Sequence, residues 1–163
     1  MKKLFLLTAF AVPFFLAACN DNKDKKTETE TTASQPGETP VQLSNVVELT
    51  ANDQLKFDKI EINVKAGEKV TLTLKNVGSM PKESMGHNFV LLKDGTDLDA
   101  FEKEAMQAPE HIPANNAAIV AHTKLLGPGE SDTIEFTVPA GQYTFICSFP
   151  GHYKSMLGIL TAQ

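Results

Sequence analysis

From about residue 46 onward, the chain alternates hydrophobic and polar residues with the period of a β-strand. The clearest case is residues 69–76 (KVTLTLKN), in which valine and leucines would face one side and lysines and threonines the other. A period of two with one polar face is typical of a half-buried antiparallel strand. Residues 132–138 (DTIEFTV) repeat the pattern. Residues 87–93 (HNFVLLK) are nearly all apolar, so we expect them in the middle of a sheet.

Other short runs of the same kind are separated by turn sequences such as KAGEK, GPGE and PAGQ. These runs are residues 46–51, 55–64, 118–126, 141–148 and 156–162. One segment changes to helical spacing, with apolar residues at Leu98, Phe101 and Ala105, Asp97 as the expected N-cap and Pro109 as the end. The pattern therefore predicts an all-β fold, an eight-stranded Greek-key sandwich or small barrel with one inserted short helix.

The N-terminus has a different composition. Residues 1–18 combine a basic start (MKK) with an apolar stretch too short for a stable transmembrane helix, and they lead into LAAC. A small-residue cleavage site followed by cysteine resembles the lipobox of bacterial lipoproteins. The resemblance implies removal of residues 1–18 as a signal peptide and lipid modification (palmitate) of Cys19. The alternative is an ordinary secretory signal with an incidental cysteine.

Residues 19–44 contain almost no large apolar side chains, so we expect a disordered polar tether after Cys19, leading to one folded domain at 45–163. The whole chain has a net charge of −5. Removal of residues 1–18 takes away Lys2 and Lys3. Thirteen lysines and 20 acidic residues then remain, so the net charge becomes −7. All the basic residues are lysine, and this charge balance argues against nucleic acid as a partner.

The candidate chemistry lies in CSFPGHYKSM, residues 147–156. If Cys19 is acylated, Cys147 has no cysteine partner although an exported domain could form disulfides. Cys147, His152 and Met156 follow the spacing Cys-x4-His-x3-Met, and His87 stands at the start of another expected strand. Two imidazoles, a thiolate and a weak axial thioether are the ligand set of blue-copper electron-transfer sites. The residues therefore predict one type 1 copper ion.

Four segments together resemble the azurin family of bacterial cupredoxins: ANDQLKF, MGHNFVLL, AHTKLLGPGE and CSFPGHYKSM. The resemblance covers about residues 45–163 and implies a cupredoxin-like fold. It also implies that the Gly86 carbonyl is a weak ligand of the metal and that Asn88 connects the two ligand loops by hydrogen bonds. An apolar patch for docking redox partners is implied at Met85, Phe149, Pro150 and Gly151.

The resulting hypothesis is a single-electron carrier that cycles between Cu(I) and Cu(II) and is not an enzyme, because four protein ligands leave no open position for a small-molecule substrate. The expected partners are periplasmic redox proteins such as c-type cytochromes or copper or haem reductases, and a membrane reached through the lipid. The expected location is the periplasm or outer membrane of a Gram-negative bacterium. The alternative is a copper storage or delivery module without productive electron transfer.

Overall fold

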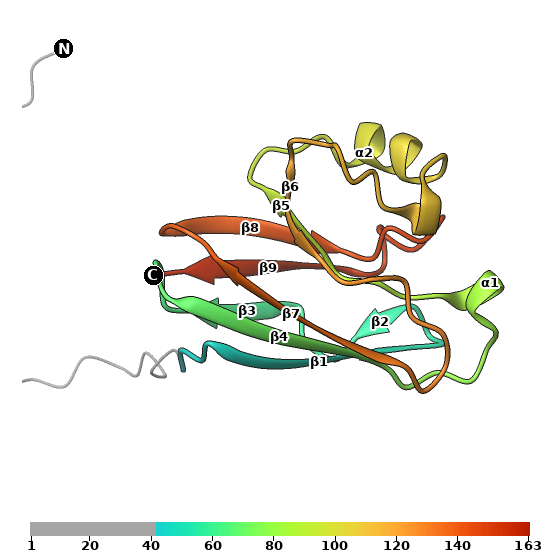
Figure 1. Cartoon of the computed structure of the whole chain (residues 1–163), viewed down its shortest axis with the longest axis horizontal. Helices are drawn as coiled ribbons and strands as arrows, with labels where there is room; N and C mark the ends of the chain where they lie inside the picture. The colour runs from blue at the N-terminus through green and yellow to red at the C-terminus, as the bar shows by residue number, and fades with distance from the viewer. Residues whose placement is uncertain (1–41) are drawn as a thin grey trace, which may run out of the picture. The chain divides into compact units, whose positions relative to one another are not determined.

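A computed structural model describes residues 42–163, so the signal peptide, Cys19 and nearly all of the tether lie outside the described residues. The described part is a sandwich of two β-sheets (Figure 1). The first sheet has the order β2-β1-β4-β7 and the second β3-β9-β8-β5-β6. The first contains β1 (Val46–Asn52), β2 (Lys56–Phe57), β4 (Lys69–Asn76) and β7 (Ser131–Thr137). The second contains β3 (Glu61–Val64), β5 (Val90–Lys93), β6 (Ile119–His122), β8 (Gly141–Ile146) and β9 (Leu157–Ala162).

The predicted all-β sandwich is confirmed, with three corrections. Residues 42–163 hold nine strands rather than eight, because the run at 55–64 divides into β2, which pairs with β1, and β3, which pairs with β9. No strand joins the two described sheets, so the fold is not a closed barrel. Strands were expected to be antiparallel, but β1 runs parallel to β4, and β3 runs parallel to β9. These parallel pairs arise because the chain crosses to the other sheet between β2 and β3 and crosses back between β3 and β4.

The core lies between the sheets and follows the alternation read from the sequence. Val70, Leu72 and Leu74 of β4 are completely buried, while the residues between them are less buried. Phe145 packs its ring 5.7 Å from that of Phe57 and 5.3 Å from that of Phe89, measured between centroids. Burying large apolar side chains in this way is the main favourable contribution to folding.

Helix α2 (Leu98–Ala105) matches the predicted helix, and the Asp97 side chain accepts a hydrogen bond from the Ala100 N–H at 3.0 Å, as expected of an N-cap. Two further short elements were not predicted: α1 (Lys82–Met85) and the 3₁₀ turn η1 (Pro109–His111). Both are single turns without helical periodicity. Within the described residues, no helix has the length and apolar character needed to cross a bilayer.

The sandwich has two distinct ends. Gly141 pairs with Ala162 at one end of β8 and β9, and Ile146 pairs with Leu157 at the other, where residues 147–156 join the two strands. The chain enters at the first end, because the Ser44 N–H donates to the Asn63 carbonyl near the close of β3. Seven residues of β1 separate this entrance from the other end, about 20 Å of strand.

Candidate metal centre

The first loop of the site carries His87 and follows directly after α1. His87 forms an isolated bridge with Leu126, donating its N–H to the Leu126 carbonyl at 3.1 Å and accepting from the Leu126 N–H at 2.8 Å. The preceding residue must be glycine, because a Cβ on Gly86 would lie 2.7 Å from the Lys82 carbonyl oxygen and 3.0 Å from the Leu125 side chain. Backbone pairing with Leu126 and close packing around Gly86 thus fix the position of the His87 backbone.

The second loop, residues 147–156, connects β8 to β9 as a series of tight turns. The Cys147 N–H donates to the Met156 carbonyl at 3.0 Å, and the Met156 N–H donates to the His152 carbonyl at 2.8 Å. Gly151 has a φ of +80°, a left-handed conformation that glycine adopts without strain. These bonds close the loop on itself, so Cys147, His152 and Met156 come from one compact segment.

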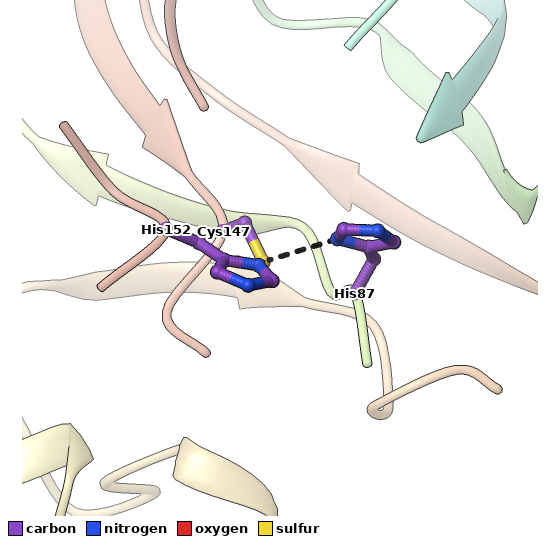
Figure 2. Close-up of side chains that lie close together, drawn as sticks. All are labelled: His87, Cys147 and His152. Atoms are coloured by element: carbon purple, nitrogen blue, oxygen red, sulfur yellow. Dashed lines mark hydrogen bonds between the residues drawn. The ribbon is translucent and has the colours of Figure 1, made fainter. Parts of the chain in front are cut away.

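The two loops bring the side chains of His87, Cys147 and His152 together (Figure 2). Their potential ligand atoms lie within 4.8 Å of one another. The Cys147 Sγ is 3.5 Å from the His152 Nδ1 and 3.9 Å from the His87 Nδ1. His87 and Cys147 are completely buried and His152 is 4% exposed. Met156, in the same loop, is also completely buried.

These separations fit a three-coordinate metal. A metal in a trigonal arrangement, at about 2.3 Å from sulfur and about 2.0 Å from each imidazole nitrogen, places sulfur and nitrogen about 3.7 Å apart. The two measured Sγ–Nδ1 distances lie on either side of that value. The metal therefore fits among the three atoms with little rearrangement, and the thiolate–imidazole donor set suits copper.

Burial sets different protonation states for the thiol and the two imidazoles in the metal-free site. Burial raises the pKa of the Cys147 thiol to about 12, although the backbone N–H groups of Asn88 and Phe149 oppose this. Burial also lowers the pKa of His152 to about 4, aided by the nearby His87 and His111, and burial lowers the pKa of His87. At neutral pH both imidazoles are therefore neutral ligands, and metal binding must displace the thiol proton.

Asn88 connects the two loops. Its Oδ1 accepts from the Ser148 N–H at 2.8 Å, and its Nδ2 donates to the Ser148 Oγ at 3.0 Å. The Ser148 hydroxyl lies 2.6 Å from the His111 carbonyl oxygen, to which it can donate. A fully buried amide with both ends hydrogen-bonded holds its partners rigidly, because leaving such groups unpaired is costly.

The four residues expected to form the docking patch differ in exposure. Met85 and Pro150 are half-buried and Gly151 is exposed, whereas Phe149 is only 8% exposed. The Phe149 ring lies 4.6 Å from the His152 ring and 5.0 Å from the His111 ring, centroid to centroid. Phe149 therefore contributes an aromatic contact to His152 rather than a broad surface.

Sequence reasoning missed several neighbours of the site. His111 is half-buried, and its ring lies edge-on against that of Phe149. Glu102 and Asp99 of α2 contact residues on either side of His152. No local signal could have revealed these contacts, because their partners lie 49 and 54 residues later in the chain.

Known proteins are similar to this chain in sequence and in fold. A family model described as copper binding proteins, plastocyanin/azurin family, matches residues 43–163. Azurin of Bordetella pertussis is 43% identical over 122 residues, covering 70% of this chain and 81% of that protein. Azurin-1 of Alcaligenes xylosoxydans xylosoxydans is 39% identical, covering 70% of this chain and 94% of that protein.

Outer membrane protein H.8 of Neisseria gonorrhoeae is 41% identical over 118 residues, covering 68% of this chain and 63% of that protein. Among solved structures, the crystal structure of Na-dithionite reduced auracyanin from Roseiflexus castenholzii is similar, with a TM-score of 0.68 and 38% identity. That alignment covers 75% of this chain and 99% of the auracyanin chain.

Proposed function

We propose a function from the premise that the chain belongs to the plastocyanin/azurin family of copper-binding proteins. It is a blue-copper protein that carries single electrons between redox partners. The observation that carries this proposal is the cluster of His87, Cys147 and His152, whose ligand atoms lie within 4.8 Å of one another and match a trigonal copper site.

In the proposed site, His87 Nδ1, Cys147 Sγ and His152 Nδ1 would be the main ligands that hold the copper. Met156 and the Gly86 carbonyl would be additional, weaker ligands. Copper, when bound, supplies a one-electron couple between Cu(I) and Cu(II). The chain holds both imidazoles neutral, excludes water by burial and fixes Ser148 through Asn88. A site held rigidly needs little rearrangement when an electron moves.

The proposed path for the electron runs through His152. Its ring is nearly covered, but it lies against Phe149 and beside Pro150 and Gly151, which reach the surface. With Met85 these residues form the proposed docking patch for c-type cytochromes or copper or haem reductases. Contact with such partners is expected to be small and transient, as is usual for redox encounters.

Exchange of electrons with a c-type cytochrome tests this proposal against copper storage or delivery. We expect the reduced, copper-loaded protein to be reoxidised by oxidised cytochrome c within seconds, followed by stopped-flow absorbance. Met85→Glu should slow the exchange about tenfold, because it places a charge in an apolar docking patch. Val46→Glu, at the opposite end and already 72% exposed, should leave the rate unchanged. Tight copper binding without exchange over hours would instead support storage or delivery.

We further propose that the domain is anchored through a lipid on Cys19 to the outer membrane of a Gram-negative bacterium, with the domain in or facing the periplasm or the cell surface. Support comes from the LAAC sequence and the polar segment that follows it. The similar protein H.8 is itself called an outer membrane protein.

Cys19→Ala tests the anchor. We expect the wild-type protein in the membrane fraction and the variant in the soluble fraction, since the lipid needs the Cys19 thiol. Asn20→Ala, which keeps the cysteine, is the control for membrane association. Immunoblots of the separated fractions provide the measurement. If the Cys19→Ala protein stays with the membrane, another feature of the chain attaches it.

A further inference from the structure

Helix α2 contacts the ligand loop on both sides of His152. The Glu102 Oε1 accepts a hydrogen bond from the Gly151 N–H at 3.0 Å. The Tyr153 hydroxyl donates to the Asp99 Oδ1. Asp99 and Glu102 are three residues apart, so they lie on neighbouring positions of one helix face. Two carboxylates from a single turn thus contact the residue before His152 and the residue after it.

The helix has its own attachment to the sandwich. Phe101 and Ala105 are buried in a cluster with Val90 and Ile146, and this cluster also includes Tyr153. Ile146 is the last residue of β8, next to Cys147. The helix therefore packs against the same strand ends that carry the site. In this position it can hold the ligand loop, residues 147–156, in place.

The Glu102 side chain is buried, although a glutamate that only stabilises a helix is normally exposed to solvent. It is 7% exposed, and its second oxygen, Oε2, is buried without a hydrogen-bond partner. Burying a carboxyl group costs free energy unless its hydrogen bonds compensate, and here the Gly151 N–H is its one hydrogen-bond donor within the described residues. The free-energy cost of burying this carboxyl group suggests that its contact with the Gly151 N–H has a functional role.

We infer that Asp99 and Glu102 are positioning residues that hold the backbone around His152, so that its imidazole is in place before copper arrives and stays there when copper changes oxidation state. The inference rests on the proposed role of His152 as a copper ligand. The two carboxylates act from outside the ligand set, through Gly151 and Tyr153. Preorganised ligands need less movement on metal binding and on electron transfer.

Glu102→Ala and Glu102→Gln separate the hydrogen bond from the charge. Both remove the carboxylate, but the glutamine amide oxygen can still accept from the Gly151 N–H. Glu104→Ala is the matched control, because Glu104 lies on the same helix and, among residues 42–163, its side chain bonds Asn116 rather than the ligand loop. Tyr153→Phe removes the second contact. Each change is made in the full-length chain.

The first measurement is hydrogen exchange of the Gly151 amide in the copper-free protein. We expect about tenfold faster exchange in Glu102→Ala, because its acceptor is lost, with near wild-type exchange in Glu102→Gln and Glu104→Ala. Amides of β4 in the core should be unchanged. Equal exchange in the alanine and glutamine variants, or faster exchange of the β4 amides as well, would overturn the inference.

The second measurement is electron self-exchange between Cu(I) and Cu(II) forms, followed by NMR line broadening. Glu102→Ala and Tyr153→Phe should each slow self-exchange severalfold, and Glu102→Gln should restore most of the rate. Rates equal to wild type in both variants would overturn the inference while leaving the proposed function intact. A wild-type protein that forms no blue copper site would refute the proposed function, whereas the exchange result for Gly151 would still stand.

Discussion

Cys147→Ser is expected to abolish the intense blue absorption that the wild-type protein develops when Cu(II) is added to the metal-free form. That absorption arises from charge transfer between a thiolate and copper. A serine oxygen cannot supply it, because a hydroxyl is a poorer and harder donor than a thiolate. Cys147 is the free cysteine that the structure describes, and its Sγ faces both imidazoles. The loss should therefore be complete.

Visible absorption and EPR spectra of the copper-loaded proteins provide the measurement. Ser155→Ala is a suitable control, because Ser155 lies in the same loop with an exposed side chain. It should keep both the colour and the narrow copper hyperfine splitting of a blue site. A colourless wild-type protein with a tetragonal EPR signal would contradict the ligand assignment, as would a blue Cys147→Ser protein.

Gly158→Ala is expected to lower the free energy of unfolding by about 3 kcal/mol, at the upper end of what overpacking a core usually costs. A Cβ at this position in β9 would lie 2.2 Å from the Phe145 ring and 2.6 Å from the Ile60 carbonyl oxygen. Phe145 is completely buried between two other rings and cannot move aside freely. The melting temperature should fall by about 10–15 °C.

Urea unfolding of the copper-free protein, followed by circular dichroism, measures this loss. Phe145→Leu gives the Gly158→Ala methyl group room, so the double variant should be less destabilised than the sum of the two single changes. Part of the loss should remain, because the Ile60 carbonyl is still close. Additive effects would show that the Phe145 ring is not what limits the space at Gly158.

The alternation of apolar residues was sufficient to predict the sandwich, because one face of most strands meets the core and the other meets water. It could not show how strands pair. The parallel partners of β1 and β3 are β4 and β9, which come from distant parts of the sequence. The pattern also missed the break between β2 and β3. The run includes Ile60, which is 62% exposed and belongs to neither strand.

For the site, spacing within one loop and the chemistry of copper pointed to Cys147, His152 and Met156, and family resemblance supported His87 and Asn88. The structure brings the side chains of the cysteine and two histidines together, and ties the loops through Asn88. The contacts of Glu102 and Asp99 with the loop could not be read in advance. A carboxylate on a helix usually faces solvent, but the packing of Phe101 and Ala105 against the strand ends leaves Asp99 and Glu102 facing Tyr153 and Gly151.

The parallel pairing of β1 with β4 places the start of the described chain far from the copper loops. The Ser44 N–H donates to the Asn63 carbonyl in β3, and the Asn45 side chain accepts from the Lys65 N–H in the turn before β4. Helix α1 and the loop between β8 and β9 lie at the opposite end of the sandwich (Figure 1). The first described residues therefore cover none of the surface around the copper loops, which the proposed partners would approach.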